Sequence, residues 1–268
     1  MADEAPNPVA AGYDAVYAAM PNSPTLRQLW REHAAGLDFP DEFAHISFVT
    51  LKELRRMTQE LRLSPGQTLV DLGCGLAGPS LLAARDSGTK LLGVDLSGRA
   101  VAEAERRADS LGFAGNASFV TGSFADTGLP DAVADAVMSE DALQYAPDKL
   151  AAMKEAARVA RPGARFVFTV FELDPVRVAG LPVLGTDPVD DYRPLLEASN
   201  FTVDRYEQVP GWPEPMTSAY TAVLAARDAL TDEMGEAAVA ALSAEMAVTI
   251  ARSPYKRRVL AVATRKGT

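Results

Sequence analysis

The sequence is poor in the side chains that most often bind transition metals. Its 268 residues include one cysteine, Cys74, and two histidines, His33 and His45. A single thiol can form neither an intramolecular disulfide nor a cysteine-based metal cluster. The two histidines do not stand at ligand spacing from acidic residues, so we expect no metal site and no metal-dependent mechanism.

An excess of basic charge and long apolar runs are also lacking. The chain has 36 acidic and 26 basic side chains, which gives a formal net charge of −10. A negative surface repels nucleic-acid phosphates and anionic membranes, so neither is an expected partner. No apolar stretch is long enough to span a bilayer, and the first residues do not resemble a secretory signal. These absences predict a soluble, cytoplasmic protein.

Hydrophobic residues nevertheless make up 48% of the chain, enough for a sizeable core. In residues 1–63 the apolar spacing predicts only helices, at 13–20, 25–34 and 43–61. The last is the clearest, because Phe48, Leu51 and Leu54 recur at helical spacing. A turn follows at residues 64–66. We interpret residues 1–63 as an N-terminal helical lid.

Strands and helices alternate in residues 64–210, which predicts crossover connections and a parallel sheet with helices on both faces. Expected strands lie at 67–72, 91–95, 117–121, 134–139, 165–171 and 202–208, and expected helices at 79–87, 98–111, 149–160 and 191–199. Residues 211–253 break this rhythm with two Ala-rich helices, at 218–230 and 234–252. That segment is too long for a plain connection, so we expect a helical cap inserted before a seventh strand within residues 254–268.

The stretch VDLGCGLAG at residues 70–78 is a strand that ends in a Gly-rich turn and opens a helix. Gly73 and Gly75 let the backbone approach a ligand closely, and the helix N-terminus offers free N–H groups. Alone, this pattern also fits dinucleotide-binding proteins. Asp71 favours a different ligand, because a carboxylate there suits the ammonium group of a bound amino acid. Asp95 ends the next strand, where it can bind ribose hydroxyls, and the two together indicate S-adenosylmethionine.

Four motifs then resemble the class I S-adenosylmethionine-dependent methyltransferases, in the branch that modifies small molecules. They are VDLGCGLAG, LLGVDLS, DAVADAVMSEDALQYAPD and EAARVARPGARFVF, within residues 61–171. The resemblance implies an α/β fold: a Rossmann-like, seven-stranded, mostly parallel sheet with helices on both faces. It implies S-adenosylmethionine as cofactor, S-adenosylhomocysteine as product and a small-molecule substrate. It leaves the chain as a monomer or a homodimer.

By this resemblance Asp71, Gly73 and Gly75 surround the methionine part of the cofactor, Asp95 holds the ribose and Leu96 packs on adenine. Relatives often read the adenine amino group with an acid that is Ser123 here, so either Ser123 suffices or Asp126 bends back. Tyr17 could reach the cofactor's carboxylate, or could form a packing stripe with Tyr13. The full set of expected cofactor-binding residues is Asp71, Gly73, Gly75, Asp95, Leu96, Ser123, Phe124, Ser139 and Tyr17.

A general base is harder to assign, because Gln144 and Tyr145 stand where relatives often carry histidine. The catalytic candidates are Glu140, Asp141 and His45. Asp141 could equally cap the following turn, and His45 could merely pack on the face of a helix. Trp212, Met216, Tyr220, Met234 and Met246 populate the cap; a few of them around a pocket would favour a hydrophobic substrate.

The predicted reaction is transfer of a methyl group to an O, N or C atom of a small, hydrophobic organic substrate, which needs mainly alignment and exclusion of water. The Ala- and Arg-rich composition suggests bacterial secondary metabolism, such as antibiotic biosynthesis. The main alternative is a protein of the same fold that binds the cofactor without transferring methyl, as a cyclase or a binding module. A nicotinamide-dependent oxidoreductase is a third possibility, and would bind NAD instead.

Overall fold

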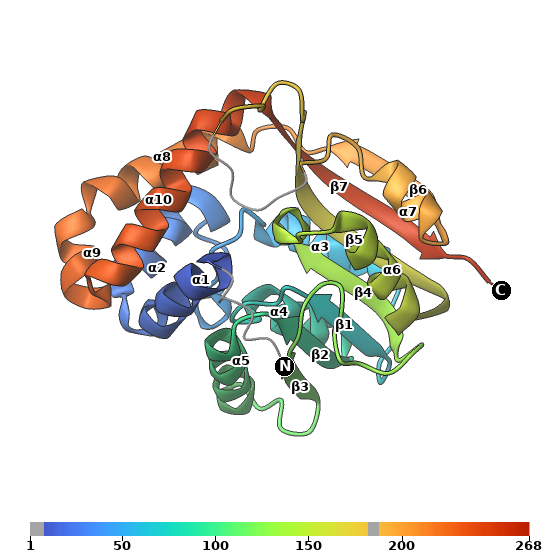
Figure 1. Ribbon diagram of the computed structural model, residues 1–268. Helices are drawn as coiled ribbons and strands as arrows, with labels where there is room; N and C mark the ends of the chain where they lie inside the picture. The colour runs from blue at the N-terminus through green and yellow to red at the C-terminus, as the bar shows by residue number, and fades with distance from the viewer. Residues whose placement is uncertain (1–7, 182–187, 268) are drawn as a thin grey trace, which may run out of the picture.

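The computed structural model describes residues 8–181 and 188–267 (Figure 1). Its centre is a seven-stranded sheet in the order β3-β2-β1-β4-β5-β7-β6. The strands are β1 (Thr68–Leu72), β2 (Lys90–Asp95), β3 (Ala117–Thr121), β4 (Ala134–Glu140), β5 (Ala160–Leu173), β6 (Phe201–Gln208) and β7 (Lys256–Arg265). Only the pairings of β7 with β5 and β6 are antiparallel within this sheet. The predicted seven-stranded, mostly parallel sheet is confirmed.

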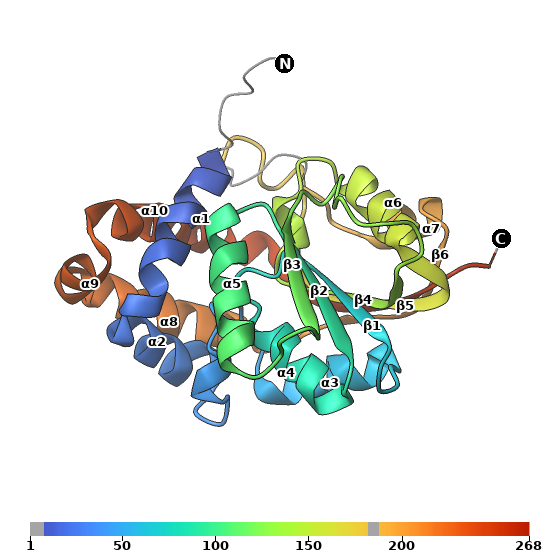
Figure 2. The same cartoon turned by 90° about the horizontal axis from the view of Figure 1, so that it is seen from below.

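Helices cover both faces of this sheet. They are α1 (Pro8–Ala19), α2 (Pro24–Trp30), α3 (Leu51–Leu61), α4 (Gly78–Ser87), α5 (Gly98–Ser110), α6 (Lys149–Val159), α7 (Arg193–Ala198), α8 (Pro213–Ala225), α9 (Arg227–Met234) and α10 (Glu236–Arg252). Figure 2 shows α6 and α7 over one face and α3 and α4 over the other. The strands bury apolar side chains in both directions: Leu69 joins one hydrophobic cluster while its neighbour Val70 joins the other. No helix in the described parts of the chain is long and apolar enough to cross a membrane.

The lid and the cap lie together at one end of the molecule, where α1 and α2 pack against α8, α9 and α10 (Figures 1 and 2). The cap contains three helices, whereas the sequence predicted two. Ala226 ends α8 and begins α9, and Gly235, with φ +83°, separates α9 from α10. The start of the lid, residues 1–7, is outside the described residues.

The helix predicted at residues 43–61 is wrong in its first half. A 3-10 turn at Asp41–Phe43 precedes seven non-helical residues, and α3 begins only at Leu51. The reason is local: the Thr50 hydroxyl accepts from Glu53 N (3.3 Å) and caps the helix there.

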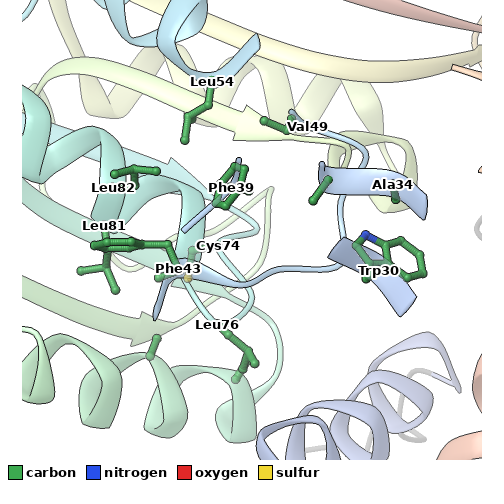
Figure 3. Packing of buried hydrophobic residues seen from close by; sticks show 14 of the residues in the cluster. Trp30, Ala34, Phe39, Phe43, Val49, Leu54, Cys74, Leu76, Leu81 and Leu82 are labelled. Atoms are coloured by element: carbon green, nitrogen blue, oxygen red, sulfur yellow. The ribbon is translucent and has the colours of Figure 1, made fainter. Parts of the chain in front are cut away.

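The segment before α3 is instead held by packing. Phe39 and Phe43 lie between the Gly-rich loop and α4 (Figure 3). A Cβ atom at Gly78 would stand 2.2 Å from the Phe43 carbonyl oxygen, so only glycine permits this approach. The lid is thereby anchored beside the loop that follows β1.

A buried ionic cluster joins β7, α3 and the loop after β4. Arg258 is 1% exposed, and its Nε and Nη2 atoms donate to the Asp141 carboxylate at 2.8 and 3.1 Å. Its Nη1 atom donates to both carboxylate oxygens of Glu53 at 2.9 Å. Asp141 also accepts from Phe48 N at 2.9 Å. One guanidinium therefore balances two buried carboxylates from distant parts of the chain.

We expect Arg258→Met to lower the free energy of unfolding by about 3–5 kcal/mol, because it leaves Asp141 and Glu53 charged, buried and unpaired. Urea unfolding followed by circular dichroism measures the change. Arg106→Met is the matched control: Arg106 pairs with Glu103 at the surface, where its side chain is 65% exposed, and its loss should cost about 1 kcal/mol or less. Equal effects of the two substitutions would contradict the assigned role.

Candidate active site

A single continuous cavity follows the carboxyl edge of the sheet, between the core on one side and the lid and cap on the other. Its walls include the Gly-rich loop after β1, the ends of β2, β4 and β5, the lid residues Tyr13 to Phe48, and one face of α10. The carboxyl edge of such a sheet is where open α/β proteins bind ligands. The cavity therefore has a core end, beside the Gly-rich loop, and a cap end, beside α10.

The Gly-rich loop makes a close approach that side chains would block. Gly73 and Gly75 have φ of +77° and +52°, and the amide groups of Gly73 and Cys74 both donate to the Val94 carbonyl oxygen. A Cβ atom at Gly73 would stand 2.9 Å from Phe124 Cζ, and one at Gly75 would stand 3.0 Å from Tyr17 Oη. Tyr17 and Phe124 thus lie directly against the loop, and both line the cavity.

Asp95 lies at the carboxyl end of β2 and lines the cavity. Its two oxygens accept from Gly75 N and Ser97 N, at 2.8 and 2.9 Å. Each carboxylate oxygen retains a second lone pair for a ligand hydroxyl. Next to it, Leu96 is 46% exposed at the cavity wall, so an apolar ring bound there would remove it from water.

Asp126, in the loop after β3, lies outside the cavity wall. Ser123 and Phe124 line the cavity, and Asp126 is not part of its wall. Asp126 instead accepts from Gly128 N (3.3 Å), and its own amide donates to Ser123 Oγ (3.0 Å). The turn faces outward, so Asp126 does not bend back toward the ligand site.

Two buried carboxyl groups lie behind the centre of the cavity. Asp71, on β1, accepts no hydrogen bond from the described residues, and neither does Glu140 Oε1. Burial, together with the nearby Asp95, raises the pKa of Asp71 to about 7, and the Ser80 hydroxyl limits this rise. Burial and the Asp71 carboxyl also raise the pKa of Glu140 well above its usual value. Two such groups favour a ligand that brings positive charge.

Two expected site residues serve the fold in this structure. The Ser139 hydroxyl is fully buried and donates to the Leu72 carbonyl oxygen (2.6 Å), behind the cavity wall. Asp141 touches the cavity, but its carboxylate is occupied by Arg258 and Phe48 N. The Asp141 side chain thus has a structural role, but through Arg258 and the lid rather than as the expected cap of the following turn.

His45 lies in the non-helical segment before α3, so the expected position on a helix face is wrong. Its ring packs edge-on against Phe39, and its Nδ1 atom accepts from Ser47 N (3.2 Å). Burial lowers the pKa of His45 to about 3. The neutral ring therefore carries its hydrogen on Nε2, which lacks a partner among the described residues. At the cavity His45 offers a donor rather than a base.

The cap end of the cavity is lined by aromatic and aliphatic side chains. Phe48 lies 5.9 Å from Tyr220 and 6.1 Å from Phe171, measured between ring centroids. Of the cap residues singled out in the sequence, Tyr220 and Met246 line the cavity. Trp212, Met216 and Met234 are buried in the hydrophobic core. His33 is remote, and its Nδ1 atom lies 2.8 Å from Ser218 Oγ.

Three charged residues at the cap end, Glu245, Arg252 and Lys256, line the cavity and were not identified from the sequence. Strand alternation could have revealed Lys256, because it shares one face of β7 with the buried Arg258. Helical spacing could have done the same for Glu245 and Arg252, which lie two turns apart on α10.

The residues of the core end fit S-adenosylmethionine. Its ammonium and sulfonium groups supply the positive charge that Asp71 and Glu140 lack, its ribose hydroxyls match Asp95, and its adenine matches Leu96 and Phe124. Gly73 and Gly75 line this end of the cavity, where its methionine part would lie. No group of three or more potential metal ligands occurs within residues 8–181 and 188–267.

Comparison with known proteins agrees with this geometry. A methyltransferase domain family matches residues 70–168. The chain is 28% identical over 226 residues to 27-O-demethylrifamycin SV methyltransferase from Amycolatopsis mediterranei, covering 80% of this chain and 81% of that one. It is 26% identical to the methyltransferase phqN from Penicillium fellutanum, where the match covers 56% of this chain and 42% of the fungal protein.

Solved structures share the fold at lower identity. The [4+2]-cyclase SpnF superposes with a TM-score of 0.75 and 20% identity, over 97% of this chain and 96% of that one. A geranyl diphosphate methyltransferase in complex with S-adenosylmethionine gives a TM-score of 0.60 and 21% identity, over 80% and 84%. Residues 70–168 thus match a methyltransferase domain family, and with the Gly-rich loop, the acid at the end of β2 and the sheet order described above these matches support the class I S-adenosylmethionine-dependent methyltransferases.

Proposed function

We propose that this methyltransferase alkylates an O, N or C atom of a small, hydrophobic organic substrate in bacterial secondary metabolism. The observation that carries the proposal is the continuity of the cavity, from the Gly-rich loop to the aromatic cap end. A cofactor at the core end and an acceptor at the cap end would meet near Glu140. The rifamycin methyltransferase and the Streptomyces halstedii methyltransferase GfsG, 28% identical over 200 residues, support a bacterial tailoring role.

S-adenosylmethionine, when bound, supplies an electrophilic sulfonium methyl group. The protein's contribution is to align the acceptor and to exclude water. Tyr17, on α1, packs against the Gly-rich loop, and Phe48, Phe171 and Tyr220 line the acceptor end. These walls come from the lid, the sheet and the cap, so the acceptor is enclosed only when all three are in place.

Glu140 is the best placed of the three base candidates. Asp141 is held by Arg258, and His45 presents an N–H group, whereas Glu140 lines the cavity with an unpartnered oxygen in the described structure. Burial and the Asp71 carboxyl raise the pKa of Glu140, and a carboxylate with a raised pKa is a stronger base than a solvated one. An acceptor hydroxyl or amine would lose its proton to Glu140 as the methyl group is transferred.

Structural similarity to a cyclase supports a second candidate function. The cyclase SpnF aligns with nearly the whole chain, cap included, and the position where relatives often carry histidine is Gln144. The alternative is a protein that retains the cofactor and uses the cap end to fold a substrate into a ring. The two functions differ in the fate of the cofactor.

We expect incubation with methyl-labelled S-adenosylmethionine and a panel of phenols, amines and polyketide-like acceptors to yield labelled product and S-adenosylhomocysteine in equal amounts. Mass spectrometry of the mixture measures both. Asp95→Ala should suppress both by weakening ribose binding, and Asp86→Ala, on the exposed surface of α4, should suppress neither. A product rearranged without label, with the cofactor unchanged, would favour the cyclase.

For an O or N acceptor we expect Glu140→Gln to lower kcat by about 10²-fold or more, because the substrate proton then has no acceptor. Glu140→Asp should restore part of the rate. Stopped assays at saturating cofactor measure kcat, and calorimetry checks that the affinity for S-adenosylhomocysteine is retained. Glu172→Gln, a buried carboxyl outside the cavity, is the control. Full turnover by Glu140→Gln would remove Glu140 from proton transfer.

We expect cofactor binding to release a proton near neutral pH. The Asp71 carboxyl of the free protein has a pKa of about 7, and a bound ammonium group stabilises its ionised form. Affinity should therefore fall as the pH drops below 7, by up to about tenfold per unit. Calorimetry in two buffers with different ionisation heats measures the release, and Asp71→Asn should reduce it. An affinity independent of pH between 6 and 8 would contradict this role.

The raised pKa of Asp71 also affects the stability of the ligand-free protein. Because the folded protein holds the Asp71 proton more tightly than the unfolded chain does, this group lowers the stability of the ligand-free protein as the pH rises from about 4 to about 7. Asp71→Asn should remove that part of the pH dependence in urea unfolding.

A further inference from the structure

The cap end of the cavity contains a buried arginine, two of whose guanidinium nitrogens have no hydrogen-bond partner among the described residues. Arg252, the last residue of α10, is 3% exposed and lines the cavity. Its Nε and Nη2 atoms donate to none of the described residues. A buried guanidinium without hydrogen bonds costs stability. An arginine that is in this state in the ligand-free protein is expected to bind a ligand.

The unpartnered atoms form a matched pair of donors. On an arginine, Nε–H and Nη2–H point the same way and together suit the two oxygens of a carboxylate or a phosphate. The same protein shows this geometry in use: Arg258 binds the Asp141 carboxylate through Nε and Nη2 at 2.8 and 3.1 Å. In Arg252 the equivalent edge is unoccupied by any described side chain.

Lys256, four residues further on, adds a second positive charge. It lines the same cavity, and its Nζ atom lies 5.1 Å from the centroid of the Phe171 ring. No ion pair to Lys256 is formed by the residues that the structure describes. Burial and the neighbouring Arg252 lower the pKa of Lys256 to about 8, although Glu245 opposes the fall.

Among the described residues, Glu245 is the nearby acid that forms no ion pair, so one carboxyl group faces two cations. Glu245 Oε1 accepts from Tyr13 Oη (2.9 Å) and Tyr145 Oη (2.6 Å), and Asp141 is paired with Arg258. The cap end therefore combines apolar walls, from Phe48, Tyr220 and Met246, with an excess of positive charge. This combination complements a molecule with an apolar body and an anionic end.

We infer that the methyl acceptor is an amphipathic organic acid, whose carboxylate or phosphate binds the Nε–Nη2 edge of Arg252 beside Lys256. This inference rests on the proposed function and specifies its substrate class. The apolar body of the acid would lie along Phe48, Phe171 and Tyr220, toward Glu140 and the cofactor.

Four probes with the same ten-carbon chain test the inference: decanoate, decyl phosphate, decanol and decylamine. They are titrated by calorimetry into the full chain saturated with S-adenosylhomocysteine, so the result does not depend on methyl transfer. We expect decanoate, decyl phosphate or both to bind at least about tenfold more tightly than decanol, and decylamine to bind most weakly. Which anion binds better distinguishes the carboxylate from the phosphate.

Arg252→Met should abolish this preference and leave the affinity for S-adenosylhomocysteine unchanged. Arg227→Met, which removes a surface charge from α9, should alter neither. We also expect Arg252→Met to unfold at the same temperature as the unsubstituted protein or higher, since it removes an unpaired buried charge, whereas a structural arginine would give the opposite shift.

Failure of both anions to bind, equal binding of decanoate and decanol, or an anion preference that survives Arg252→Met would overturn the inference. Each of these results would leave the methyltransferase proposal untouched, because the label-transfer experiment tests that separately. Conversely, anion binding by a protein that transfers no label would support Arg252 and reject methyl transfer.

Discussion

The contact of Arg258 with Asp141 and Glu53 is the constraint on which the active site depends. It joins the last strand to the loop after β4 and to the lid helix α3, and Asp141 in turn holds Phe48. Phe48 is a wall of the acceptor end. A buried guanidinium between two carboxylates is costly unless every partner is in place, so the cavity keeps its shape only when three distant segments meet.

The two ends of the cavity carry ionisable groups of opposite kind. Within the described residues, Asp71 and Glu140 at the core end form no ion pair, and neither do Arg252 and Lys256 at the cap end. A positively charged cofactor and a negatively charged acceptor would satisfy both ends at once. Such a distribution also favours correct placement, because either molecule bound in the wrong end would face charge of its own sign.

Much of this could be predicted from local sequence. The alternation of strands and helices gave the sheet, and the Gly-rich turn with Asp71 and Asp95 gave the cofactor end, because these features depend on neighbours in the chain. The ion pair of Asp141 could not be predicted, since its partner Arg258 lies more than a hundred residues away in the chain. The start of α3 has a local cause, the cap formed by the Thr50 hydroxyl. The role of Gly235 in dividing the cap was overlooked, although a glycine between two helical patterns is a local signal.

One oxygen atom, Glu245 Oε1, accepts hydrogen bonds from Tyr13 on α1 and from Tyr145 in the core. Tyr13 stacks on Tyr17, the residue that faces Gly75. The first helix therefore cannot move away from the cofactor loop without loosening α10, which forms the acceptor's wall. An opening of the cavity at one end would thus also disturb its other end.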